Sequence, residues 1–81
     1  METRVGVVGI VIDDLESATM VNQILHEFAD MIVGRMGIPY REKGICVISV
    51  IVDGTVDALS GMTGKLGKVK GVTVKSALTK K

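Results

Sequence analysis

Apolar residues are grouped in short blocks along the chain, and their spacing predicts four strands and two helices. The block from Val5 to Ile12 is rich in β-branched residues and too short for a buried helix, so we expect a strand there. Blocks at 45–52 and 72–78 predict two more strands, the last with polar residues at alternate positions. A further strand is expected at 32–41. Because Pro39 has no N–H to donate, that strand is expected at an edge of the sheet.

Two segments between these strands repeat apolar residues at helical spacing. The first helix is expected at about 16–30, and either Asp14 or Ser17 can cap it. The second begins after Thr55 or Asp57, which are its two candidate caps. The apolar positions of the two helices are Ala18, Val21, Ile24, Leu25, Phe28 and Ile32 in the first, and Leu59, Met62 and Leu66 in the second.

The predicted elements follow the order β-α-β-β-α-β, which is the split pattern of ferredoxin-like domains. The expected fold class is therefore α+β, with an antiparallel four-stranded sheet of order 4-1-3-2 and two helices on one face. Glu42, Lys43 and Gly44 are expected to turn the chain between the second and third strands. With 81 residues, the chain is expected to form a single domain over 1–81.

Both central strands of this predicted sheet are apolar on both faces. The third strand presents Ile45, Val47 and Ile51 on one side, and on the other Cys46, Ile48, Val50 and Val52. Strands of this kind are buried on both faces, whereas the two helices can cover only one. We therefore expect a second copy of the chain to cover the other face in a dimer or tetramer. The candidate interface residues are Val47, Ile48 and Val50; the pattern leaves open which side of the strand faces outward.

The composition is consistent with a small cytoplasmic protein. It is 47% hydrophobic but only 2% aromatic, so the core must be built from Val, Ile, Leu and Met. The single cysteine, Cys46, excludes an intramolecular disulfide, and nothing indicates an oxidising compartment. The longest apolar runs fall far short of the ~20 residues that a transmembrane helix needs. We expect a cytoplasmic location and no membrane partner.

Charge is distributed unevenly along the sequence. All nine acidic residues fall at or before Asp57. Most of the lysines follow it: Lys65, Lys68, Lys70, Lys75, Lys80 and Lys81. A basic C-terminal third suits weak binding of nucleic acid or another anion, which is the alternative function. The simpler explanation is a solvated surface. RNA-binding domains of this topology stack bases on aromatic residues of the central strands, and these strands have none, which argues against nucleic acid.

The sequence contains no catalytic constellation, so we expect no enzyme, no cofactor and no metal. His26 is the only histidine and is expected at the surface of the first helix. Cys46 lies in an apolar strand, which is typical of a small core residue. Asp13 and Asp14 follow the first strand and are expected to cap the next helix. One histidine and one cysteine cannot supply the three or four ligands of a zinc, iron or nickel site unless subunits contribute jointly.

Three segments resemble a known family. The stretch 34–42, Gly-Arg-Met-Gly-Ile-Pro-Tyr-Arg-Glu, resembles the small ACT-like proteins known as iron-only hydrogenase system regulators. The segments 63–67 and 71–78 are similar to the same family, so the resemblance covers nearly the whole chain. It implies an ACT-like, ferredoxin-like fold, oligomerisation, and a non-enzymatic regulatory role in which the protein senses an unknown ligand or partner.

The same family is similar to the C-terminal, ligand-sensing domain of nickel-responsive repressors. That similarity implies that Cys46 matches the repressors' metal-binding cysteine, whereas the matching histidine positions hold Ile38 and Tyr40. Without imidazoles a square-planar nickel site cannot be assembled. ACT domains that bind amino acids carry a glycine in the loop after the first strand. This chain has Asp-Asp-Leu-Glu at 13–16, which argues against amino-acid binding.

The candidate ligand-binding residues are Arg35, Tyr40 and Arg41 in the second predicted strand. An extended strand places Arg35 and Arg41, six residues apart, on the same side. A guanidinium suits a carboxylate or phosphate, and Tyr40 adds an amphipathic surface. We therefore predict an anion site near this strand, completed by a second subunit. The alternative is that both arginines only keep an edge strand soluble or pair with acids such as Glu42.

Overall fold

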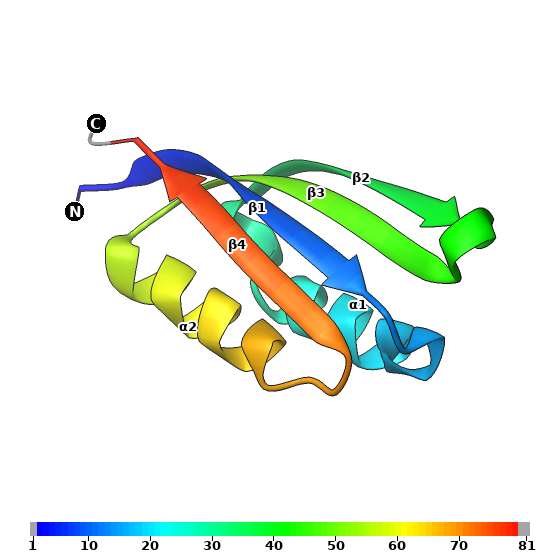
Figure 1. Ribbon diagram of the computed structural model, residues 1–81. Coiled ribbons are helices and arrows are strands. Elements are labelled where there is room, and N and C mark those ends of the chain that lie inside the picture. Colours follow the sequence, from blue (N-terminus) through cyan, green and yellow to red (C-terminus); the bar gives the residue numbers. More distant parts are fainter. Residues whose placement is uncertain (1, 80–81) are drawn as a thin grey trace.

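The computed structural model describes residues 2–79 and shows the predicted βαββαβ order (Figure 1). The strands and helices, in chain order, are β1 (Arg4–Ile12), α1 (Ala18–Glu27), β2 (Ile32–Tyr40), β3 (Ile45–Gly54), α2 (Val56–Gly67) and β4 (Val72–Leu78). Three short 3-10 turns connect some of them: η1 (Leu15–Ser17), η2 (Ala29–Met31) and η3 (Arg41–Lys43). The boundaries lie close to those that the apolar spacing predicts.

The four strands form one antiparallel sheet in the order β2-β3-β1-β4, which is the predicted order read from the other edge. Both helices lie on the same side of this sheet (Figure 1). Pro39 is in the edge strand β2, where it faces Cys46 of β3. Within residues 2–79, no helix has the length and apolar character needed to cross a membrane.

The first helix is shorter than the predicted span of 16–30. The chain enters it through η1, where the Asp14 carboxylate accepts a hydrogen bond of 3.1 Å from the Glu16 backbone N–H. Ser17, the other candidate cap, makes no capping bond, because its hydroxyl donates instead to the Lys70 carbonyl at 2.7 Å. After Phe28 the chain turns through η2, so the C-terminal part of the predicted helix is a 3-10 turn.

The second strand also ends one residue earlier than predicted. Arg41 belongs to η3, and Gly44, with φ of 65°, completes the connection to β3. The left-handed conformation of Gly44 is one that glycine adopts without steric cost. The predicted turn at 42–44 is therefore present, but it begins at Arg41.

Of the two candidate caps of α2, Thr55 is the one that acts as N-cap. Its hydroxyl oxygen accepts a hydrogen bond of 3.1 Å from the Ala58 backbone N–H. Asp57 lies inside the first turn, where a carboxylate interacts favourably with the positive end of the helix dipole.

The core lies between the sheet and the two helices. Its buried residues are Val8, Ile10, Ile12, Val21, Ile24, Leu25, Met31, Ile48, Val50, Val52, Leu59, Met62 and Leu66. The members that come from β1 and β3 are alternate residues, because side chains alternate between the faces of a strand. Burying each of these aliphatic side chains fully stabilises the fold by roughly 1.5–3 kcal/mol relative to leaving it exposed. Cys46 is partly buried and packs against this core, as predicted for a small core residue.

Candidate functional site

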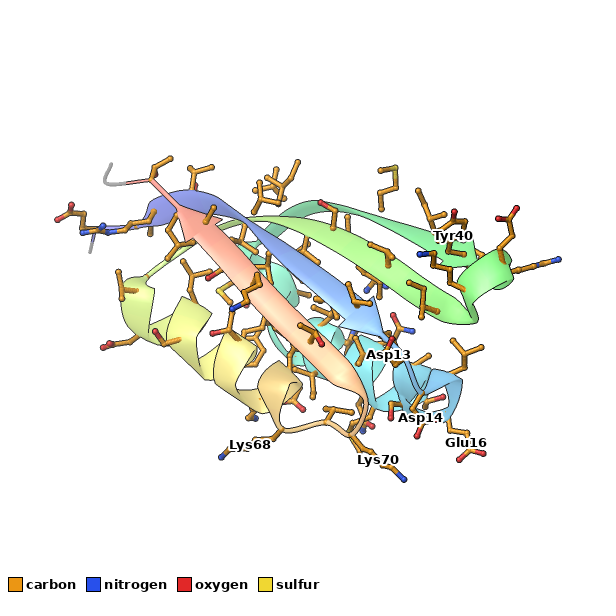
Figure 2. The ribbon with its side chains drawn as sticks, viewed as in Figure 1. Asp13, Asp14, Glu16, Tyr40, Lys68 and Lys70 are labelled. Carbon is orange, nitrogen blue, oxygen red and sulfur yellow. The ribbon has the colours of Figure 1, made fainter. Side chains whose placement is uncertain are left out.

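The side of the sheet away from the helices carries a continuous set of exposed apolar side chains, which we call the open sheet face. Its large apolar residues are Val5, Val7, Met36, Ile38, Tyr40, Val47 and Ile51. They come from three adjacent strands, and pairs such as Val7 with Ile51 and Ile38 with Val47 face each other in the ladder. Figure 2 shows Tyr40 among the side chains that project from this side.

Two small residues, Gly9 and Ser49, occupy the middle of the open sheet face. Gly9 of β1 lies opposite Ser49 of β3 on one side and Lys75 of β4 on the other. The neighbouring rows hold larger apolar pairs, Val7 with Ile51 and Val11 with Val47. Exposed apolar side chains that are grouped on one face in this way are typical of contact with another protein.

Of the three candidate interface residues, only Val47 lies on the open sheet face, with 36% of its surface exposed. Ile48 and Val50 are 3% and 0% exposed and face the helices. The prediction that they lie at an outward surface is therefore wrong. The helices cover the even-numbered positions of β3, and the sequence pattern alone did not distinguish the two sides.

The candidate ligand-binding residues are not brought together. Arg35 faces Val50 in the ladder, so its side chain is on the helix side of β2. Tyr40 faces Ile45 and lies on the open sheet face. Arg41 lies beyond the end of the strand, in η3, so the expectation that it shares a strand side with Arg35 is wrong.

Arg35 instead lies in a pocket between α1 and β2. Its Nη2 atom donates a hydrogen bond to the Asn22 Oδ1 atom, and the Asn22 Nδ2 atom donates to the Ala18 carbonyl at 3.1 Å. The pocket has a volume of about 370 Å³ and is lined by Asn22, Leu25, His26, Ala29, Ile32 and Arg35. His26 was predicted at the surface of the first helix, but no sequence signal indicated that Asn22 or Arg35 lies beside it.

Among the described lysines of the C-terminal third, three line one groove together with Glu16 and Glu27, and Lys75 lies elsewhere. The Lys65 ammonium pairs with the Glu27 carboxylate at 2.8 Å. Lys68 and Lys70 lie near the end of α2 and line a groove that also contains Glu16 (Figure 2). Lys75 is on the open sheet face, and Lys80 and Lys81 lie outside the described residues.

The side chains in residues 2–79 include no cluster of three or more histidine, cysteine or acidic residues that could hold a metal ion. Cys46 packs against the core on the helix side, whereas Ile38 and Tyr40 are on the open sheet face. The three positions that match the ligands of nickel-responsive repressors therefore do not converge within one subunit. Asp14 caps η1 as predicted, and Asp13 is exposed beside it (Figure 2).

Solved structures with the same fold include the uncharacterized protein TM1266 from Thermotoga maritima, which is 34% identical with a TM-score of 0.92. The match covers 98% of this chain and 100% of that one. A formyltetrahydrofolate deformylase from Pseudomonas putida is 13% identical with a TM-score of 0.65, over 90% of this chain and 28% of that enzyme. At that identity the likeness concerns the fold alone.

Curated relatives carry the name "Putative nickel-responsive regulator". The protein from Saccharolobus solfataricus is 30% identical over 67 residues, and one from Saccharolobus islandicus is 25% identical over 67 residues. Each match covers 83% of this chain and 50% of the relative, so the chain spans about half the length of these proteins.

A family model described as "TM1266-like: Iron-only hydrogenase system regulator, putative" matches residues 4–76. This range runs from the start of β1 almost to the end of β4, and it includes the segments 34–42 and 63–67 and most of 71–78. The chain therefore belongs to the TM1266-like family of iron-only hydrogenase system regulators.

Proposed function

We propose that this protein is a non-enzymatic regulatory module of the cytoplasm, formed by a single ACT-like domain, that senses a ligand as a homo-oligomer. The observation that carries the proposal is the open sheet face. Val5, Val7 and Ile51 are each 46% exposed, and Met36 is 62% exposed. Removing apolar surface from water is favourable by roughly 25 cal/mol per Å², before the entropic cost of association is subtracted, so this face favours association.

A second copy of the chain is the occupant that this face favours. The apolar residues are accompanied by charges of both signs, Lys75 on β4 and Asp53 on β3. In a two-fold arrangement the same patch meets itself, so each charge can approach the opposite charge of the other copy. The smaller residues Gly9 and Ser49 leave room in the centre for a larger side chain from the partner.

The family supports regulation, and the curated relatives support a sensing role within a longer regulator. The name of these relatives refers to nickel, but in this chain Cys46 is separated by the sheet from Ile38 and Tyr40. We therefore propose that this chain senses a different ligand. The groove that holds Lys65, Lys68 and Lys70 also holds Glu16 and Glu27, so we favour a sensing role over the nucleic-acid alternative.

The proposal is tested by the mass of the protein in solution. Sedimentation velocity and light scattering at micromolar concentration are expected to give a dimer or tetramer for the wild type. Ile51→Lys, on the open sheet face, is expected to give a monomer with the same circular dichroism spectrum. Gln23→Lys, on the exposed surface of α1, is the control and is expected to keep the oligomer. A monomeric wild type, or an Ile51→Lys variant of unchanged mass, would overturn the proposal.

A further inference from the structure

The pocket between α1 and β2 contains a guanidinium that is hydrogen-bonded to a neighbouring side chain. Asn22 donates its Nδ2–H to the Ala18 carbonyl, and in this orientation its Oδ1 atom points toward Arg35. The Arg35 Nη2 atom uses one N–H group in this bond, and the other N–H groups of the guanidinium remain available. A positioned arginine loses less entropy on binding a planar anion than a mobile one.

The lining of this pocket is suited to a negative charge. None of the six lining residues is acidic, and Arg35 has no carboxylate partner among residues 2–79. His26 lies one helical turn after Asn22 and lines the same pocket, so its imidazole N–H offers a further donor. By contrast, the groove between α1 and α2 that contains Lys68 and Lys70 also contains Glu16 and Glu27.

The remaining walls are apolar. Leu25, Ala29 and Ile32 line the pocket, and its volume of about 370 Å³ lies within the range of small-molecule sites. Inorganic phosphate would leave this apolar surface uncovered. A short aliphatic chain would cover it while a carboxylate accepts paired hydrogen bonds from the guanidinium.

We infer that the pocket formed by Arg35, Asn22 and His26 binds a small aliphatic carboxylate. This inference rests on the proposed sensing function and names the ligand class for it. Arg35 has Val50 opposite it on the helix side, and its neighbour Met36 lies on the open sheet face. Because Arg35 and Met36 are consecutive in β2, a ligand that restrains the Arg35 side chain also restrains the backbone that carries Met36. This adjacency gives the carboxylate a physical route to the face that is proposed to join two copies.

The probe is valerate, titrated into the wild-type protein and followed by calorimetry and by two-dimensional NMR of the backbone amides. Butanol is the control for the apolar part and phosphate the control for the charge. Saturable binding of valerate, with the largest shifts at residues 22–35, is expected. Arg35→Gln is expected to weaken it at least tenfold, because a charge-assisted pair is lost. Arg41→Gln, an arginine change outside the pocket, is expected to leave it unchanged.

The inference is overturned if valerate does not bind at millimolar concentration, if phosphate binds as tightly as valerate, or if Arg35→Gln binds like the wild type. Circular dichroism establishes that Arg35→Gln is folded, and His26→Gln provides a second variant, expected to weaken valerate binding by a smaller factor. Sedimentation of the same samples separates the two proposals. An oligomer without valerate binding contradicts only the carboxylate site, and a monomer that binds valerate contradicts only the oligomer.

Discussion

Val47 and Ile48 are consecutive residues of β3 whose side chains lie on opposite faces of the sheet. Val47 is 36% exposed on the open sheet face, whereas Ile48 is 3% exposed beneath the helices. Lysine at position 47 can extend its ammonium into water, so Val47→Lys is expected to fold but to associate less. Lysine at position 48 buries an unpaired charge, so Ile48→Lys is expected to unfold. Circular dichroism and sedimentation measure both effects.

A folded Ile48→Lys variant would contradict the assignment of the two faces, and so would an unfolded Val47→Lys variant. A second pair of variants, in which both residues are shortened to alanine, shows whether the difference arises from burial and not from the size of the lysine side chain. Ile48→Ala is expected to cost about 2–5 kcal/mol of unfolding free energy, as is usual for a core truncation. Val47→Ala removes a side chain that is already one-third exposed and is expected to cost clearly less.

Two glycines are expected to respond in opposite directions to alanine. Gly71 has φ of 72°, and a Cβ atom there would lie 2.7 Å from the Asp14 Cβ atom. Its carbonyl also accepts a hydrogen bond of 2.7 Å from the Asp13 N–H. Gly71→Ala is therefore expected to destabilise the fold by about 1–2 kcal/mol or more. Gly64 lies inside α2 with open space around it, so Gly64→Ala is expected to stabilise by about 0.5–1 kcal/mol.

Urea denaturation of these two variants checks the prediction, with m-values used to confirm that only stability changes. Equal effects of the same sign would show that neither the left-handed backbone at Gly71 nor the open space at Gly64 determines the outcome.

The N-cap hydrogen bond of α2 is expected to raise the unfolding free energy by a measurable amount. Because the Thr55 hydroxyl satisfies the Ala58 N–H, Thr55→Ala is expected to cost about 1 kcal/mol. In a domain of this size, that loss lowers Tm by about 4–8 °C. Thr55→Ser keeps a capping hydroxyl and serves as the control, with Tm expected close to that of the wild type. If a thermal unfolding scan gave the same decrease in Tm for the serine and alanine variants, the role of the cap would be contradicted.

The strand order and the helical part of the core followed from the sequence because local patterns determine them. Apolar residues at helical spacing, such as Val21 and Leu59, are buried, and Pro39 restricts its strand to an edge. The pattern did not determine which alternate set of β3 faces the helices. Both Val47 and Ile48 are apolar, so the choice depends on how the helices dock against the sheet.

The candidate ligand site was predicted only in part for a similar reason. Arg35 was identified from its own chemistry, but its bond to Asn22 joins residues 13 positions apart in sequence, through a tertiary contact. Arg41 was misplaced because the chain leaves the strand after Tyr40 and forms η3. A one-residue change in a boundary is enough to separate two residues that periodicity places together.

The ion pair between Glu27 and Lys65 is expected to contribute little. Its side chains are 48% and 55% exposed, and water and salt screen charges in such positions. A double-mutant cycle with Glu27→Gln and Lys65→Met is expected to give a coupling free energy of about 0.2–1 kcal/mol, decreasing at high salt. Methionine keeps apolar atoms next to the Phe28 ring, which the Lys65 ammonium approaches at 5.7 Å from the centroid. A salt-independent coupling of several kcal/mol would contradict this expectation.

Restoring histidines at the positions that match the nickel-responsive repressors is not expected to restore a thiolate-bound nickel site. In Ile38→His/Tyr40→His, both imidazoles lie on the open sheet face, while the Cys46 sulfur stays on the helix side. Nickel bound to such imidazoles therefore lacks sulfur as a ligand, even if a second subunit contributes nitrogen.

The measurement is the near-ultraviolet absorption of the nickel-loaded double variant, compared with the same variant carrying Cys46→Ala. The two spectra are expected to coincide, with no sulfur-to-nickel charge-transfer band. A band that disappears with Cys46 would show that the three side chains reach one metal ion, and the assignment of Cys46 to the helix side would be wrong.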